Sequence, residues 1–209
     1  QVIHSAKTNF QSNALAAGVI QSILAAAIID AHAGIKLSRF TSEQDPHSTA
    51  CLLMLHHGRA DWAHCGDSRV YHFRAGELVS RSVDHSHVMN LVKMGYLTEA
   101  QAEEHPQKNL LISCLGDTDD PKIDFGAASP LCDGDCFLLC SDGLWAYFSD
   151  QELGRVLSEF PVRQAAEILI NTVRDRANGR GDNCSFAIVR LKTIVEERPV
   201  PPWKRSVAK

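Results

Sequence analysis

Four short apolar runs separated by glycine-containing turns occupy residues 49–80, and this pattern restricts the fold more than any other feature. Runs of this length joined by such turns are typical of antiparallel strands. We expect strands over residues 49–56, 60–65, 69–74 and 78–80 that form one antiparallel meander. Further strand-length runs cover residues 2–6, 123–128, 135–140 and 184–191.

The remaining apolar residues recur with helical spacing. Residues 14–37 predict one helix, or two that meet near Ala25, and later helices are expected over 84–95, 98–105, 150–159 and 162–176. Thr98 and Gln101 resemble a capping box, and Gly95 is placed to end a helix. Strands in runs, with helices grouped between and after them, predict an α+β layered domain and not a doubly wound parallel sheet.

Length and charge narrow the class of protein. A chain of 209 residues fits a single domain, which we expect over residues 1–192 before a charged, proline-rich tail over 193–209. The net charge of -4 gives no basic patch for nucleic acid. The apolar run over residues 14–29 is short for a membrane span and contains Gln21 and Ser22. We therefore expect a buried helix, no membrane span and a cytoplasmic location.

Seven cysteines are an odd number, and several lie in apolar runs, which favours free thiols in a reducing compartment. Cys132, Cys136 and Cys140 are spaced by four and could form a zinc or iron–sulfur site. However, the usual C-x-x-C pair is missing. Strand periodicity also places Cys136 and Cys140 on one face of a strand. Buried thiols are the favoured interpretation.

Two aspartates stand at the ends of strand-length runs. Asp142 follows the run over 135–140, and Asp182 precedes the run over 184–191. If these two strands are antiparallel neighbours, both aspartates lie at the same edge of the sheet. Carboxylate oxygens suit Mg²⁺ or Mn²⁺, and a cation would relieve their repulsion. Two separate, solvated turn aspartates are the alternative, and the spacing alone does not decide between them.

Three ordered motifs resemble those of a known family. They are Gly66-Asp67-Ser68-Arg69, Cys140-Ser141-Asp142-Gly143-Leu144-Trp145 and Gly181-Asp182-Asn183. In this order and at these separations they resemble the metal-dependent (PPM, type 2C) protein serine/threonine phosphatases, the bacterial branch above all. Asp84-His85-Ser86, the segment from His105 to Asn109 and Leu115-Gly116 also match that branch. The resemblance covers roughly residues 14–190, and the ordered set is far more specific than any single motif.

The resemblance implies a fold, an activity and a cofactor. The fold is a four-layer sandwich of two antiparallel sheets flanked by helix pairs. The activity is hydrolysis of phosphoserine or phosphothreonine in proteins that a serine/threonine kinase has phosphorylated. The cofactors are two Mn²⁺ or Mg²⁺ ions, with a weaker third, which activate a water molecule.

The resemblance also assigns residues. Asp142 and Asp182 match catalytic metal ligands, and Asp84 matches a ligand of the third ion. Residues 84–109 match a mobile flap, in which His105 handles substrate. A solvated residue at a helix end is the alternative for His105. Asp67 and Arg69 are interpreted as structural, because a turn aspartate satisfies backbone N–H groups and Arg69 can pair locally.

One part of the family pattern is missing. The family has an arginine, an acidic pair and a D-G-x-G-G turn upstream, whereas residues 1–29 contain no Asp, Glu or Arg. Asp30 is better explained as a polar residue on a helix. Either an internal piece is absent and the join near Phe10 to Asn13 is artificial, or the protein is an inactive relative that binds phosphoproteins or a partner. We favour the first explanation, because losing a central strand would expose a sheet edge.

Overall fold

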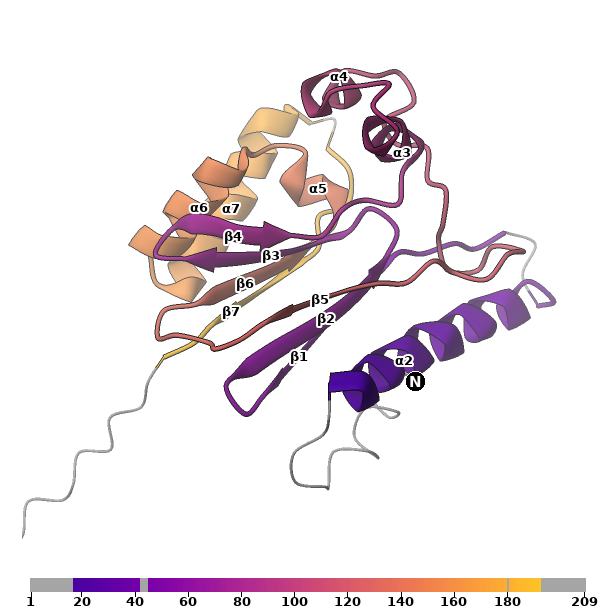
Figure 1. Cartoon of the computed structure of the whole chain (residues 1–209). Coiled ribbons are helices and arrows are strands. Elements are labelled where there is room, and N and C mark those ends of the chain that lie inside the picture. Colours follow the sequence, from indigo (N-terminus) through magenta and orange to yellow (C-terminus); the bar gives the residue numbers. More distant parts are fainter. Residues whose placement is uncertain (1–16, 42–44, 180, 193–209) are drawn as a thin grey trace, which may run out of the picture.

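The computed structural model describes residues 17–41, 45–179 and 181–192, and two antiparallel sheets dominate these residues (Figure 1). The first sheet has the strand order β1-β2-β5, and the second has the order β4-β3-β6-β7. The strands are β1 (Ala50–His56), β2 (Arg59–Cys65), β3 (Arg69–Arg74), β4 (Glu77–Arg81), β5 (Asp124–Ala128), β6 (Cys136–Cys140) and β7 (Phe186–Arg190). The expected strands are confirmed over residues 50–190, with small changes at their ends. The strand expected over residues 2–6, the join near Phe10 to Asn13 and the tail over 193–209 lie outside the described residues.

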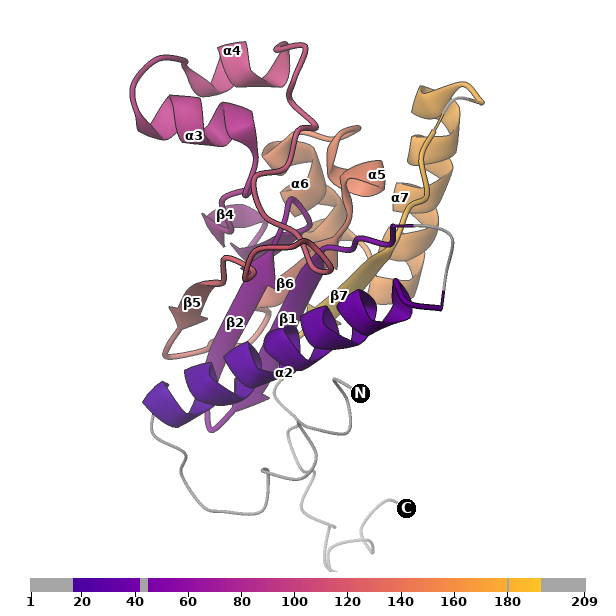
Figure 2. The same ribbon diagram turned by 90° about the vertical axis from the view of Figure 1, so that its right-hand side faces the viewer.

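Helices cover both outer faces of this sandwich. Helix α2 (Ala17–Ser38) lies across the first sheet, and α6 (Asp150–Glu159) and α7 (Val162–Ala177) cover the second (Figures 1 and 2). Three shorter helices are α3 (His87–Lys93), α4 (Glu99–Glu103) and α5 (Asp142–Trp145). Among the described residues the second sheet therefore carries a helix pair, while the first sheet carries α2 alone. The expected α+β sandwich is confirmed.

The single meander expected over residues 49–80 is wrong, because the chain changes sheets between β2 and β3. β2 pairs with β1 and β5, whereas β3 pairs with β4 and β6. Almost every residue of β2 is buried on both sides of the strand, so it needs a layer on each face. The crossing occurs at Gly66, whose φ of +98° favours glycine, and a Cβ there would lie 2.4 Å from a methyl carbon of Thr49.

Three apolar clusters fill the three spaces between layers. One lies between the second sheet and helices α5–α7, one between α2 and the first sheet, and one between the two sheets. Strand β6 serves two of them. Cys136, Leu138 and Cys140 face the helices, and Phe137 joins Trp62 and Val70 between the sheets. Both buried cysteines are thus ordinary core residues, as strand periodicity predicts, and Cys132 is exposed.

Helix α2 is one continuous helix and not two. Its buried apolar residues are Ile20, Ile23, Leu24, Ala27 and Ile28, which recur at helical spacing toward the first sheet. Residues Gly18–Ser38 also have the length and hydropathy of a membrane span, near the N-terminus, with a third of the window buried against the protein.

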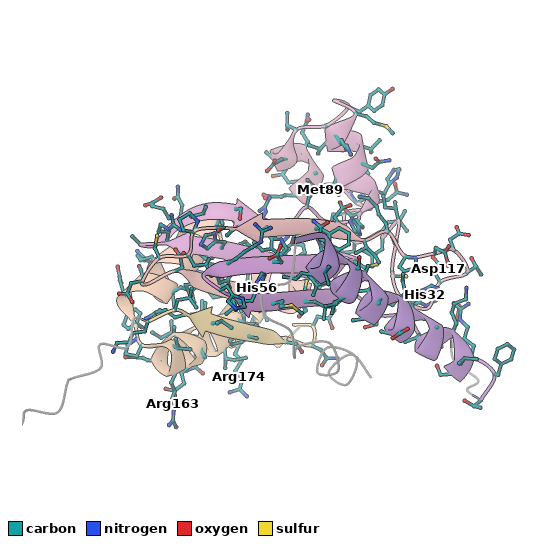
Figure 3. The ribbon with its side chains drawn as sticks, turned by 60° about the horizontal axis from the view of Figure 1, so that its bottom comes forward. His32, His56, Met89, Asp117, Arg163 and Arg174 are labelled. Carbon is teal, nitrogen blue, oxygen red and sulfur yellow. The ribbon has the colours of Figure 1, made fainter. Side chains whose placement is uncertain are left out.

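Two polar residues of α2, Asp30 and His32, have different environments. Asp30 is exposed, as expected of a polar residue on the outer face. His32 points toward the segment that carries Asp117 (Figure 3), and its Nδ1 accepts the Gly116 N–H at 3.1 Å. This contact joins the helix to the loop before β5.

Helices α3 and α4 project from one end of the sandwich (Figures 1 and 2). The capping box of Thr98 and Gln101 is present, and Gly95 follows α3 with φ +79°. The root of this excursion is closed by two backbone hydrogen bonds, from His87 N–H to Leu110 O (2.8 Å) and from Ile112 N–H to His85 O (2.9 Å). Ser86 and Leu111 also form an isolated antiparallel bridge there.

The buried carboxylate of Asp135 anchors the opposite end of β6. Arg74 donates to both of its oxygens (2.7 and 2.9 Å), and the Cys132 N–H donates at 2.8 Å. The guanidinium of Arg74 is the main cause that lowers the pKa of Asp135 to about 2.

Because its pKa is lowered in the folded protein, Asp135 stabilises the fold at pH values above the pKa of an aspartate in the unfolded chain, which is about 3.9. This contribution to stability is lost as the pH falls toward 2. We expect Asp135→Asn to unfold at a lower temperature at pH 7 and to flatten the loss of stability between pH 4 and pH 2. Thermal unfolding across this range is the measurement. Asp119→Asn, at an exposed position, is the control. A variant with the pH profile of the parent protein would contradict this role.

Candidate metal centre

The two aspartates that sequence spacing singles out lie at one edge of the second sheet. Strands β6 and β7 are antiparallel neighbours, with Cys140 opposite Phe186, which confirms the condition for their approach. The pairing continues past the strands. The Ser141 N–H donates to Ser185 O (2.9 Å), and the Ser185 N–H donates to Ser141 Oγ (3.1 Å). The start of the segment that contains Asp142 therefore lies beside the end of the segment that leads from Asp182 to β7.

Asp142 opens a short helix that the sequence did not predict. Ser141 is the N-cap of α5, and Asp142 is its first residue, with Oδ1 accepting the Gly143 N–H at 2.9 Å. An acidic residue in the first turn is favourable at the positive end of a helix. Gly143 is the second residue of this helix. A Cβ on Gly143 would lie 2.4 Å from the carbonyl oxygen of Asn183, so glycine is required by the close approach of two backbones.

Replacing Gly143 should therefore push the two segments apart. In Gly143→Ala the new methyl group meets backbone atoms of Asn183 and Cys184, which cannot rotate away. We expect a loss of about 1–3 kcal/mol in the free energy of unfolding, the usual cost of overpacking. Thermal unfolding measures this loss. Gly18→Ala on α2 is the matched control, because its Cβ would have no neighbour within 4 Å. A stability of Gly143→Ala equal to that of the control would disprove the close approach.

Asp67 belongs to the same region as Asp142. Its carboxyl is half-buried, and burial is the first cause that raises its pKa to about 6. The negative charges of Asp142 and then Asp84 raise the pKa further. Binding of a divalent cation is favourable beside a desolvated carboxylate that has two other carboxylates nearby.

Asp84 has a different environment. Arg69 donates to both of its oxygens, from Nε and Nη2, each at 2.8 Å. The side chains of this pair are 14% and 7% exposed. Both oxygens of the residue expected to hold a third ion are therefore occupied by a guanidinium. The ion-pair partner of Arg69 lies 15 residues away along the chain, while its expected local pairing is the hydrogen bond to the Tyr71 hydroxyl, two residues away.

Arg69 connects this ion pair to the motif around Asp142. Its guanidinium carbon lies 3.6 Å from the centre of the Trp145 ring, and Nη1 donates to the Tyr71 hydroxyl at 3.2 Å. Trp145 Nε1 in turn donates to the backbone oxygen of Asp67 at 3.0 Å. The cation–π contact and these hydrogen bonds hold the turn after β2 against α5.

His105 lies just beyond α4, on the excursion that contains α3 and α4. It is partly exposed, and its Nδ1 accepts the Gln107 N–H at 3.1 Å. This local contact stabilises the turn that follows the helix. Asp182 is exposed, and its Oδ1 accepts the Asn183 N–H. Asp142, Asp182 and Asp67 thus lie near one edge of the second sheet. His105 lies on the α3–α4 excursion, where its contact is with Gln107.

From the sequence, Asp67 was interpreted as structural because a turn aspartate satisfies backbone N–H groups, and a backbone hydrogen bond does lower the pKa of its carboxyl against the effect of burial. The change of sheets at Gly66, which local spacing does not predict, also places Asp67 where the two sheets and α5 meet. A meander would have left Asp67 at a hairpin tip.

Within the described residues, one further group has metal-ligand chemistry. His64, His85 and Asp124 offer ligand atoms that all lie within 4.8 Å of one another. This group is separate from the carboxylates described above and was not predicted from the sequence.

Comparisons with known proteins agree with the architecture and the motifs. The protein phosphatase PhpP of Streptococcus pneumoniae is 37% identical over 147 residues, which cover 69% of this chain and 58% of PhpP. The chain thus spans little more than half the length of that curated relative. The serine/threonine phosphatase of S. agalactiae superposes with a TM-score of 0.79 at 28% identity, covering 91% of this chain and 78% of that one.

A third similar protein is the catalytic domain of the serine/threonine phosphatase PstP, solved in complex with two manganese ions. It superposes with a TM-score of 0.69 at 23% identity, over 92% of this chain and 79% of that one, which compares the fold alone. No family model matches the chain. From the relatives, the sandwich and the ordered motifs, the chain belongs to the PPM family of metal-dependent protein serine/threonine phosphatases.

Proposed function

We propose that the chain forms a phosphatase domain that hydrolyses phosphoserine or phosphothreonine in proteins with the help of divalent metal ions. The observation that carries this proposal is the edge where β6 and β7 bring Asp142 beside the segment after Asp182, with Asp67 facing it. Relatives named as serine/threonine phosphatases support the same reaction, and the manganese ions in the PstP structure support Mn²⁺ as the metal.

The residues of this edge fit a hard cation. Asp142, Asp182 and Asp67 supply carboxylate oxygens, which Mn²⁺ and Mg²⁺ prefer. The pKa of Asp67 is raised first by burial and then by the negative charges of Asp142 and Asp84, and a bound cation would offset both effects. When bound, the ions would lower the pKa of a water molecule and so supply a nucleophile for hydrolysis of the phosphate ester. The carboxylates hold the ions, and α5 together with Trp145 fixes the position of Asp142 and of the Asp67 turn.

This proposal exchanges the roles that were expected of Asp67 and Asp84 from the sequence. Asp67 is assigned to the metal site, and Asp84 becomes a structural partner of Arg69, because the guanidinium occupies both of its oxygens. Asp142 keeps the role of a metal ligand that the resemblance assigns to it.

The other parts of the chain follow from the same proposal. Residues 84–109 act as a flap beside the metal edge, and His105 contacts the substrate from it. Residues 1–192 form the catalytic domain, with 193–209 as a tail. We further propose a cytoplasmic location and an opposing serine/threonine kinase as the source of the substrates. The alternative of an inactive relative has no support from the relatives, which are named as phosphatases.

Turnover of a phosphothreonine peptide by the full-length protein tests the proposal. We expect hydrolysis that Mn²⁺ stimulates and that a chelator abolishes. Hydrolysis that is indifferent to the chelator, or none at any Mn²⁺ concentration, would disprove it.

Two single variants separate the exchanged roles. Asp67→Asn should raise the Mn²⁺ concentration required for half-maximal activity by about 10–100-fold while leaving the fold intact, because a ligand is lost but no ion pair. Asp84→Asn should instead lower the unfolding temperature in the absence of metal, because Arg69 loses a charged partner. Activity at increasing Mn²⁺ and thermal unfolding are the two measurements. The reverse pattern would restore Asp84 as the metal ligand.

A further inference from the structure

We propose that His64, His85 and Asp124 form a second metal site, which takes a borderline transition ion such as Zn²⁺ in preference to Mn²⁺ or Mg²⁺. Two imidazoles and one carboxylate are a donor set that suits Zn²⁺, whereas hard ions prefer oxygen alone. The ligand atoms lie within 4.8 Å of one another. Tetrahedral coordination at about 2.0–2.1 Å places ligand atoms roughly 3.3–3.4 Å apart. His85 Nε2 and Asp124 Oδ2 are 3.1 Å apart and need little movement to reach this spacing.

The strand register brings these residues together. His64 on β2 is the direct cross-strand partner of Asp124 on β5. Residues in such pairs have Cβ atoms about 4.5–5.5 Å apart and project from the same face. His85 follows β4 and stacks on His64, with ring centres 4.6 Å apart. Three separate segments therefore supply one ligand each.

The ring of His64 is prepared for a metal. Its Nε2 donates to the backbone oxygen of Val83 at 2.9 Å, which leaves the lone pair on Nδ1. That Nδ1 is buried and has no hydrogen-bond partner, and the residue is only 3% exposed. A metal-bound histidine usually donates its other ring N–H to a carbonyl or carboxylate, as His64 does. An unpaired acceptor in a buried polar group is costly, and coordination would satisfy it.

His85 and Asp124 face the same space. His85 is 1% exposed, and its Nε2 lies 3.1 Å from Asp124 Oδ2 without a hydrogen bond of good geometry. The Gly66 N–H approaches His85 Nδ1 at 3.3 Å. Coordination through Nε2 moves the ring proton to Nδ1, so the Gly66 N–H must turn away. Gly66 precedes Asp67, and binding at this site is therefore coupled to the turn of the carboxylate edge.

Solvent access to Asp124 and the charges around it also suit the binding of a cation. The Asp124 side chain is 44% exposed, so an ion can enter from solvent and keep a water ligand. Lys122 Nζ lies 3.0 Å from the same Oδ2 and provides the positive charge that an ion would replace. Lys122 is therefore a competitor, and its removal should strengthen metal binding.

Cobalt(II) is the probe, because it replaces Zn²⁺ and its visible absorption reports the ligands. The full chain is titrated with Co²⁺ in excess Mg²⁺, which occupies the carboxylate edge. We expect one Co²⁺ per chain, displaced by Zn²⁺, with no sulfur-to-cobalt charge-transfer band.

The variants test each ligand. His64→Gln and Asp124→Asn should weaken Co²⁺ binding by about 100-fold or more, because loss of an outer partner alone costs about 10–100-fold. Asp124 is partly exposed, so its variant keeps the test valid if His64→Gln fails to fold. Lys122→Met should bind about two- to fivefold more tightly. His57→Asn is the matched control and should bind as the parent does, since asparagine tolerates the φ of +42° there.

Three results would overturn the site. They are no Co²⁺ binding in excess Mg²⁺, a thiolate charge-transfer band in place of a nitrogen and oxygen spectrum, and unchanged binding in Asp124→Asn. None depends on phosphatase activity, so a failure here is distinguishable from a failure of the proposed function.

Discussion

Asp142→Asn should lower kcat/KM for a phosphothreonine peptide by at least about 100-fold, since it removes a carboxylate from the centre of the metal edge. Asp142 is the residue whose charge acts on Asp67 and whose helix is packed against the segment after Asp182. Asparagine keeps the Oδ1 that accepts the Gly143 N–H, so α5 should persist. The measurement is steady-state hydrolysis at saturating Mn²⁺.

Mn²⁺ binding provides a second readout that does not depend on turnover. Calorimetry should show weaker Mn²⁺ binding by Asp142→Asn, while thermal unfolding without metal remains close to that of the parent. Asp175→Asn, at an exposed position on α7, is the control. Full activity in Asp142→Asn would remove the basis for the proposed site, whereas lost activity with unaltered Mn²⁺ binding would assign Asp142 to another step.

The largest effect on stability is expected at Arg69. In Arg69→Met the carboxylate of Asp84, 7% exposed, loses its bidentate partner. Leaving such a charge unpaired costs about 3–5 kcal/mol. For a chain of this size, the unfolding temperature should fall by roughly 10 °C. Thermal unfolding without added metal is the measurement.

A double variant separates the ion pair from simple packing. Arg69→Met with Asp84→Leu replaces both charges by apolar groups and should recover most of the lost stability, because no buried charge remains unpaired. If the double variant is as unstable as Arg69→Met, the cation–π contact with Trp145 and the bond to Tyr71 carry the stability instead. A drop of less than about 1 kcal/mol in the single variant would mean that water already reaches the pair.

Local signals in the sequence predicted the strands and the longer helices. The continuous apolar run of β6, which is buried along almost its whole length, and the helical spacing in α6 and α7 are strong patterns, and capping residues gave the start of α4. The family resemblance implied two sheets, but the strands that belong to each were not predicted, because each strand is compatible with several neighbours. The choice depends on which faces are buried, and β2 is buried on both.

The site was predicted in part. The placement of Asp142 and Asp182 at one edge required a single assumption about neighbouring strands, which the β6–β7 pairing confirms. The environments of Asp67 and Asp84 depend on side chains from β3, α5 and the segment after β4. No spacing rule contains such contacts, so the partner of Arg69 and the group around His64 were both missed.

The closed root of the α3–α4 excursion has a consequence for divergence within the family. Because the His87 N–H bonds to Leu110 O and the Ile112 N–H bonds to His85 O across its base, the chain leaves and re-enters the sandwich at one place. Doubling the length of such a loop costs only about 0.6 kcal/mol in closure entropy. Insertions and deletions between these bonds can therefore accumulate with little effect on the sheets. Selection can reshape the segment over the metal edge while the scaffold beneath it stays the same.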